Sequence, residues 1–317
     1  MAEVLISPGV LARENDQSQI TAGPIQAGAA IIGPTVKGQE DIPTLVTSYS
    51  EYQAAFGSTF LSGSNQYTFF TSISAYNYFQ NGGSTLLVTR VTPGAFSEAS
   101  SSLINTGSLG STVPSGISPF VLSTLAEGNI MNSSGSSGSN GTLVSGSSDN
   151  FRWEITSPNT SSGVFSLLLR QGNDTQTSKQ VVETYSNLSL DPLAPNYISK
   201  VIGDQVQTVS GTGTDVYLQS SGSYPNASRF IRVSAVNAQT PNYFDNAGTP
   251  KDIFTGSIPA AQSGSFGGGI GDITGSGTPS KFYQAITNTD SQGLVGTDYT
   301  TAINLLGNRD EFRYNVI

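Results

Sequence analysis

The chain contains neither cysteine nor histidine, and only 11% of its 317 residues are charged. Without a thiol or an imidazole it forms no disulfide, no thiolate zinc site, no thiol nucleophile and no histidine base. Thirteen Lys and Arg stand against 22 Asp and Glu, which gives a net charge of −9 and a pI near 4.4. Because clustered basic residues carry the affinity for nucleic-acid backbones, this balance excludes nucleic acid as the partner.

The sequence also lacks any long hydrophobic run. No stretch approaches the roughly eighteen consecutive apolar residues of a membrane-spanning helix, and the opening MAEVLISPGV has no basic region before an apolar segment. We expect a soluble protein made in a cytoplasm, without a signal peptide and without membrane insertion by this chain. Its length suffices for about two domains. The 36 glycines, with abundant Ser and Thr, favour turns and short strands over helical bundles.

Residues 1–25 predict an extended arm, because short apolar patches alternate with glycine and proline and show no helical period. Fully stretched, the arm reaches about 80 Å at roughly 3.3 Å per residue, well beyond the radius of one domain. The side chains that we expect to contact another subunit are Val4, Leu5, Ile6, Pro8, Val10, Leu11 and Ile20.

The energy of ordering this arm indicates how it could be held. Fixing its backbone costs up to about 25–50 kcal/mol, whereas burying its apolar side chains returns only about 10–20 kcal/mol. The arm should therefore be mobile unless its backbone also joins a sheet, and the sheet of another subunit is one such place. The alternative is a floppy terminus.

Residues 26–94 predict an α/β core unit, centred on the stretch from Gln66 to Val91. Its first half places aromatic and apolar side chains three and four apart, which predicts a helix whose stripe packs on another element. Asn81, Gly82 and Gly83 end this helix, and residues 85–91 follow as a buried strand. Strands are also expected at 27–33 and 43–47, and a helix at 48–57 begins with the capping pattern of Ser48 and Glu51. The stripe comprises Phe69, Phe70, Ile73, Tyr76 and Phe79.

Residues 95–296 predict a β-rich inserted and protruding region, dominated at its start by Ser, Gly, Thr and Asn. The run from Asn132 to Gly141 has the composition of a flexible loop. Two short helices are expected at 179–187 and 195–202, with Pro195 in a first turn and Gly203 as a C-terminal cap. The interval 237–296 shows no clear element. Strands are expected at 119–125, 151–156, 164–170, 206–209, 215–219 and 229–236.

Residues 297–317 predict a helix at 298–306 and a closing strand at 311–317 that return to the core unit. A strand so apolar at the end of the sequence suggests either a longer natural product or a sheet completed by another chain. The predicted fold class is α+β and β-rich: an α/β core unit with an inserted Ser/Gly-rich β domain and an extended N-terminal arm.

Several enzymatic and ligand-binding patterns were tested and rejected. The glycine-rich segment 265–277 fits neither nucleotide-binding spacing, and Gly268–Asp272 matches a calcium repeat only in part. Glu154 has no partner carboxylate for glycoside hydrolysis and is expected to face outward from its strand. Arg90, a lone base in a buried strand, is expected to form a structural ion pair. No catalytic residue, metal site or cofactor is predicted.

Three segments together resemble the contractile-tail sheath proteins of bacterial viruses. SPGVLARE near the start is similar to the S-P-G-V-x-x-x-E opening of that family. YNYFQNGGSTLLVTRV resembles its F-x-N-G-G and V-x-R-V core, here Phe79, Asn81, Gly82, Gly83 and Arg90. KQVVETYSNLSLDPLAPNYISKVIGD resembles its S-N-L-S-x-D-P block, and the order of the segments matches. The usual C-terminal domain, which contacts the inner tube, has no counterpart in this sequence.

The resemblance implies a non-enzymatic homo-oligomer of helically stacked hexameric rings. Tail tube, baseplate and tail terminator proteins would be its partners, and the virion tail its location after assembly in the host cytoplasm. Contraction of such a sheath drives the tube through the host envelope for genome delivery. Two alternatives stay open: the sheath of a phage-derived injection system or bacteriocin, and, in a different class, a β-rich tail adhesin that binds receptors. An enzyme, such as a glycosidase acting through Glu154, ranks last.

Overall fold

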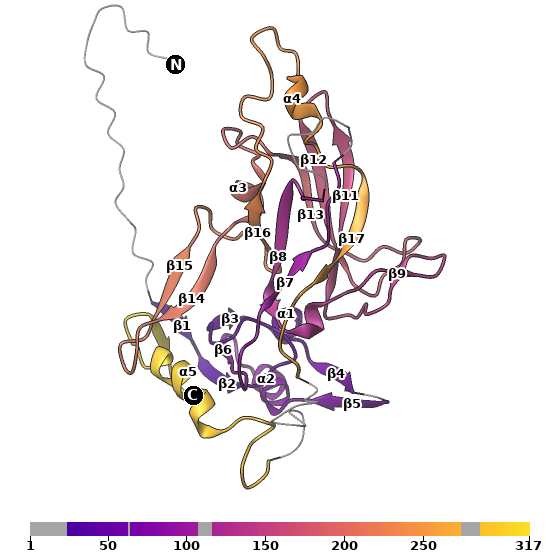
Figure 1. The fold of residues 1–317 in the computed structure, drawn as a ribbon. Coiled ribbons are helices and arrows are strands. Elements are labelled where there is room, and N and C mark those ends of the chain that lie inside the picture. Colours follow the sequence, from indigo (N-terminus) through magenta and orange to yellow (C-terminus); the bar gives the residue numbers. More distant parts are fainter. Residues whose placement is uncertain (1–23, 63, 107–115, 274–285) are drawn as a thin grey trace, which may run out of the picture.

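The computed structural model describes residues 24–62, 64–106, 116–273 and 286–317, and it has the expected β-rich α+β fold. A tall seven-stranded sheet stands above a smaller α/β part, and the C-terminal helix α5 lies beside that lower part (Figure 1). The arm residues Val4, Leu5, Ile6, Pro8, Val10, Leu11 and Ile20 lie outside the described residues.

The α/β part is built on a three-stranded sheet in the order β2-β6-β3. The central strand β6 is buried at all five positions, as predicted for a core strand, and runs parallel to β2 and antiparallel to β3. Helices α1 and α2 pack against this sheet, and a hairpin of β4 and β5 lies beside them. The bounds are β2 Ala29–Gly33, β3 Thr44–Val46, α1 Tyr49–Phe56, β4 Thr59–Ser62, β5 Asn65–Thr68, α2 Phe70–Gln80 and β6 Leu86–Arg90.

The first helix confirms its capping prediction. The Ser48 hydroxyl accepts a hydrogen bond from the Glu51 backbone N–H at 3.2 Å, and the Glu51 carboxylate accepts one from the Thr47 N–H at 2.8 Å. These contacts satisfy N–H groups that a helix start leaves without partners. The helix ends at Gly57, again as predicted.

The second helix lies within the predicted stretch, but the prediction that its aromatic stripe packs on the core is wrong. Phe70, Ile73 and Tyr76 are 46%, 44% and 45% exposed, whereas the buried side chains are small. The reason is the close approach of β2: a Cβ built on Gly33 would lie 2.5 Å from the Thr71 hydroxyl. Only small residues fit a helix face this near a strand.

The seven-stranded sheet is antiparallel throughout, in the order β13-β12-β11-β17-β7-β8-β16. Its core contains Trp153 and the stacked rings of Phe120 and Phe165, and α3 packs on the outer strands β13 and β16. The bounds are β7 Glu98–Ser101, β8 Phe120–Glu127, β11 Phe151–Asn159, β12 Val164–Gln171, β13 Val181–Ser189, α3 Ile198–Ile202, β16 Ile231–Val236 and β17 Gln262–Gly267.

Three predictions about this region need correction. The helix predicted at 179–187 is wrong, because Val181–Ser189 pairs with β12 as strand β13. The helix predicted at 195–202 begins only at Ile198, so Pro195 precedes its first turn. The interval 237–296 contains β17, which lies in the middle of the sheet.

Smaller elements decorate the sheet. The low-complexity run at 132–141 contributes to a small hairpin, β9 with β10, that projects to one side in Figure 1. The remaining elements here are η1 Asn129–Met131, β9 Ser136–Ser137, β10 Thr142–Leu143 and α4 Asp252–Thr255.

The chain returns to the α/β part through α5, as the sequence predicts. Leu305 and Leu306 on α5 pack with Ala27, Ala30 and Leu87. The closing strand is only three residues long, and it pairs in parallel with β1 of its own chain rather than with another chain. A hairpin of β14 and β15 reaches the same cluster through Val216. The bounds are β1 Ile25–Ala27, β14 Val206–Ser210, β15 Tyr217–Ser221, η2 Gly296–Tyr299, α5 Thr300–Leu306 and β18 Phe312–Tyr314.

Candidate functional site

The residues of the helix-and-strand motif build the turn between α2 and β6. Gly82 has φ +88°, a conformation that favours glycine. A Cβ on Gly83 would lie 2.3 Å from the Tyr78 ring, whose hydroxyl donates to the Thr85 carbonyl at 2.8 Å. Phe79 is half-buried and packs on the cluster beneath α1, while Asn81 follows the last helical residue. This turn fixes where β6, and therefore Arg90, enters the sheet.

The S-N-L-S-x-D-P block forms the connection from β13 to α3. Asn187 has φ +56°, and its carbonyl accepts a hydrogen bond from the Asn196 side chain. The Ser189 N–H donates to the Asn196 carbonyl at 2.9 Å, and the Asp191 carboxylate accepts from the Leu193 N–H at 2.9 Å. These contacts give the polar residues of the block a local structural role.

Arg90 is fully buried, and its predicted ion pair is wrong in its partner. Its Nη1 donates to the Gly38 carbonyl at 2.6 Å and to the Glu127 carbonyl at 3.0 Å, and its guanidinium lies 4.7 Å from the Phe96 ring. None of the ion pairs within the described ranges includes Arg90. The guanidinium therefore ties the loop after β2 to the end of β8.

Carboxyl groups surround this guanidinium. The Glu127 carboxylate accepts a hydrogen bond from the Glu40 N–H at 2.8 Å, and the Asp41 N–H donates to the Arg90 carbonyl at 2.9 Å. Burial raises the pKa of Glu127 to about 7, and burial with the nearby Glu40 raises the pKa of Asp41 to about 7. Burial also lowers the pKa of Arg90 to about 10. We call Arg90, Glu40, Asp41 and Glu127 the junction cluster.

Glu127→Gln is expected to raise the free energy of unfolding at about pH 8 and to leave it nearly unchanged at about pH 5. Since the folded pKa of about 7 exceeds the ordinary 4.5, the folded wild type holds a proton that the unfolded chain has lost, and its stability falls as pH rises across that window. The gain at the higher pH is on the order of 1–3 kcal/mol. Urea unfolding at both pH values measures it, with Glu311→Gln as a control whose effect should not depend on pH.

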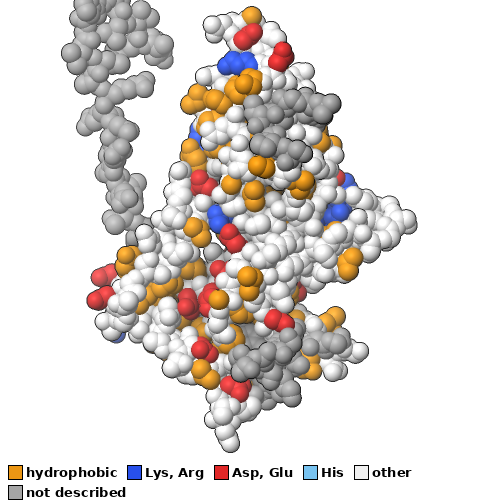
Figure 2. Space-filling view, viewed as in Figure 1, with side chains coloured by type: hydrophobic (Ala, Val, Ile, Leu, Met, Phe, Trp, Pro, Cys, Tyr) orange, Lys and Arg blue, Asp and Glu red, His pale blue; other side chains and the backbone are white. Residues whose placement is uncertain are grey.

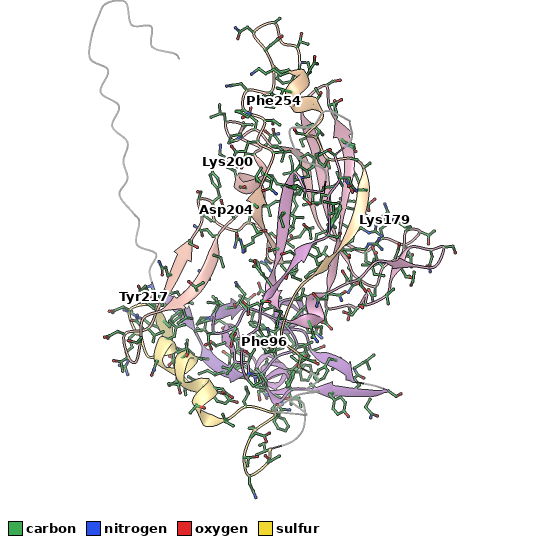
Figure 3. The ribbon with its side chains drawn as sticks, viewed as in Figure 1. Phe96, Lys179, Lys200, Asp204, Tyr217 and Phe254 are labelled. Carbon is green, nitrogen blue, oxygen red and sulfur yellow. The ribbon has the colours of Figure 1, made fainter. Side chains whose placement is uncertain are left out.

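Glu154 does not face outward, contrary to expectation. Its side chain is 12% exposed and pairs with Arg170 at 2.8 Å and with Lys179 at 2.7 Å. Arg170 also pairs with Asp174 at 2.7 Å, so the carboxylate belongs to a charged network on β11, β12 and the following loop. Figure 3 labels Lys179 beside this part of the sheet. A carboxylate held by two cations is poorly suited to donate a proton in glycoside hydrolysis.

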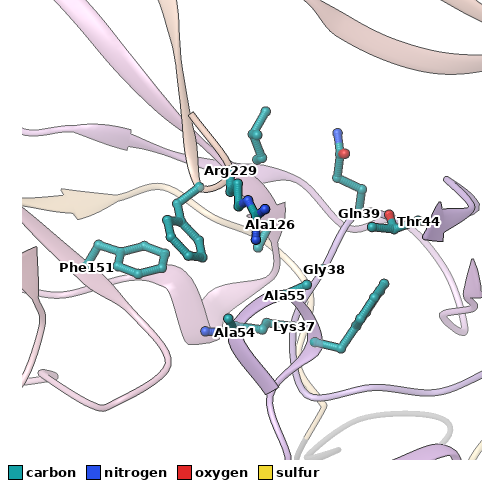
Figure 4. Close-up of a pocket in the computed structure, with 12 residues that line it drawn as sticks. Lys37, Gly38, Gln39, Thr44, Ala54, Ala55, Ala126, Phe151 and Arg229 are labelled. Carbon is teal, nitrogen blue, oxygen red and sulfur yellow. The ribbon is translucent and has the colours of Figure 1, made fainter. Parts of the chain in front are cut away.

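The outer edge of β3 pairs with no strand in the described part of the chain, and a groove of about 500 Å³ adjoins it. Across the groove, Arg229 near β16 pairs with Glu51 of α1 at 2.9 Å. A smaller pocket of about 90 Å³ shares part of this lining, with Gln39 and Thr44 on one side and Phe151 on the other (Figure 4). The groove is lined in part by Pro43, Leu45, Val46, Ala54, Leu125 and Phe230.

This groove was missed by the sequence analysis, although a signal for it was present. Pro43 directly precedes β3, and proline is tolerated at the start of an edge strand because it lacks the N–H that a central strand needs. Leu45 in the middle of the strand is 37% exposed, as expected where one more layer is absent. An edge with free backbone groups is able to pair with an added strand.

The surface offers little charge to attract a distant partner. On the face in Figure 2, Lys and Arg side chains are scattered among uncharged polar atoms and small apolar patches. Across the described residues, no group of three acidic side chains could hold a metal ion, and no helix has the length and hydrophobicity to span a membrane.

No family model matches the chain, and no curated protein sequence matches it. Two solved structures are weakly similar. The sheath tail protein from Listeria innocua has a TM-score of 0.37 and 11% identity over 89% of this chain and 38% of its own length. The sheath tail protein from Desulfitobacterium hafniense has a TM-score of 0.25 and 9% identity over 73% of this chain and 39% of its own. The chain thus spans less than half the length of either.

Proposed function

We propose that this chain is a non-enzymatic structural subunit of a contractile tail sheath. Copies would stack as hexameric rings in a helical sleeve around a tail tube, assembled in the host cytoplasm and carried on the virion. Tube, baseplate and terminator proteins would be its partners. Contraction of the sleeve would drive the tube through the host envelope for genome delivery.

The observation that carries the proposal is the open edge of β3 beside its groove. An extended segment laid along this edge would pair its backbone with β3 and bury side chains against Leu45 and Phe230. The predicted arm at residues 1–25 supplies such a segment in every copy. Added backbone hydrogen bonds contribute about 1 kcal/mol each, which helps to offset the ordering cost that its apolar side chains leave uncovered. The resemblance of three segments to sheath proteins further supports this function.

Removal of residues 2–23 is expected to abolish sleeve formation while leaving the body folded, because the open edge then receives no strand from its neighbour. Sedimentation and electron microscopy of the purified full chain and the shortened chain measure assembly, and circular dichroism checks the fold. Rings and sleeves that form equally well without these residues would contradict the tethering role. A discrete trimer that binds glycans would instead favour the adhesin alternative.

Leu45→Asp tests the groove itself. The carboxylate would enter an apolar groove beside the strand edge, so assembly should fail although the arm is intact. Leu61→Asp is the matched control, since Leu61 is 71% exposed on β4 and does not line the groove. Equal loss of assembly in both variants would argue against the β3 edge as the docking site.

A further inference from the structure

The junction cluster connects the two main parts of the molecule. Arg90 ends β6 in the α/β part, whereas Glu127 ends β8 in the seven-stranded sheet. Arg90 Nη1 bonds to carbonyls on both sides, and the Glu127 N–H donates to the Gly38 carbonyl at 3.1 Å. The Glu127 side chain accepts from the Glu40 N–H, which closes a ring of contacts around one guanidinium. Any movement of the sheet against the α/β part must break some of these bonds.

The polar groups of this cluster are incompletely satisfied. Arg90 Nε and Nη2, and Asp41 Oδ1, are buried without a hydrogen-bond partner. A buried unpaired polar atom costs free energy, so the closed arrangement has little reserve against an additional charge. These atoms also remain available to form new contacts when the cluster rearranges.

Charged groups reach the cluster from every neighbouring element. Glu40 and Asp41 come from the loop after β2, Arg90 from β6 and Glu127 from β8. Glu98 on β7 also acts on Glu127, but its carboxylate is paired with Arg232 of β16 at 2.5 Å. Three carboxyl groups of the cluster therefore face one guanidinium, and full ionisation of all three would leave negative charge in excess in a buried space.

We propose that the junction cluster is a proton-sensitive joint: with Glu127 protonated it holds the seven-stranded sheet and the α/β part in one orientation, and loss of that proton to water releases them to move. The released state lets water reach the carboxylates and removes the cost of burying them. This property belongs to the single chain and does not depend on the sheath proposal.

Spin-label distances test the joint in the full-length chain, which has no native cysteine. Asn77→Cys on α2 and Ser161→Cys between β11 and β12 place two labels at exposed positions on the two parts. At about pH 5.5 we expect one narrow distance, and at about pH 8.5 a second or broader distribution, because Glu127 has then lost its proton. The change should follow a single titration near pH 7. Dilution with unlabelled chain removes distances between copies.

Glu127→Gln in the labelled chain should keep the narrow distance at both pH values, while Glu311→Gln should retain the wild-type response. A wild-type distribution that does not change with pH, or a full response in the glutamine variant, would overturn the proposal. Should Glu127→Gln fail to fold by circular dichroism, Asp41→Asn takes its place. It is expected to reduce the amplitude of the change or shift its midpoint, and an unaltered titration would count equally against the joint.

Discussion

Arg90→Ala is expected to lower the free energy of unfolding by about 3–5 kcal/mol, because it removes the only cation from a buried group of carboxyls. The Gly38 and Glu127 carbonyls would each lose a hydrogen bond, and the space beneath the Phe96 ring would be left partly empty. Urea unfolding followed by the fluorescence of Trp153 measures the change, since that side chain is fully buried in the sheet.

The matched control is Arg229→Ala. The Arg229 side chain is 72% exposed, and its pair with Glu51 is worth no more than about 1 kcal/mol. Similar losses from the two variants would show that Arg90 contributes only as a surface arginine does, against its position in the structure. Such a result would also remove the physical basis of the joint.

Gly203→Ala is expected to lower the free energy of unfolding by about 4 kcal/mol, because two costs fall on one residue. Gly203 caps α3 with φ +105°, and a Cβ there would lie 2.3 Å from the Asn226 Cα and 2.7 Å from the Pro225 carbonyl oxygen. These are backbone atoms, so a side-chain rotation cannot relieve the overlap. Thermal and urea unfolding measure the loss.

Gly82→Ala separates the two costs. Gly82 also has a positive φ, +88°, but a Cβ there would meet nothing within 4 Å. It should cost only the backbone strain, about 1–2 kcal/mol. If both variants lost the same stability, the crowding at Asn226 would have no energetic weight, and the Gly203 argument would be wrong.

The elements that the sequence predicts well are those with strong local signals. Ser48 with Glu51 caps α1, and Gly57 ends it, because the relevant bonds join residues a few positions apart. Strands β11 and β12 also match, since buried apolar residues alternate along both. In the candidate site, Arg90 is marked by its charge within an apolar strand.

The errors arise where distant residues decide the structure. Val181, Val182 and Tyr185 fit a helical spacing, yet pairing with β12 makes their segment a strand. Strand β17 contains two glycines and two serines and gains its place only from β11 and β7 on either side. Likewise, the carbonyls that bind Arg90 belong to Gly38 and Glu127, far away in sequence. No local pattern carries that information.

The parallel pairing of β1 with β18 has a mechanical consequence. Ile25, Gln26 and Ala27 lie in register with Phe312, Arg313 and Tyr314, and β18 is anchored by Phe312 in the cluster with Leu305 and Leu306. Tension applied at residue 24 runs along the β1 axis and therefore loads the bonds of this pair together, in shear, instead of opening them one by one. A pull from outside would thus be resisted by the whole short ribbon and transmitted to α5.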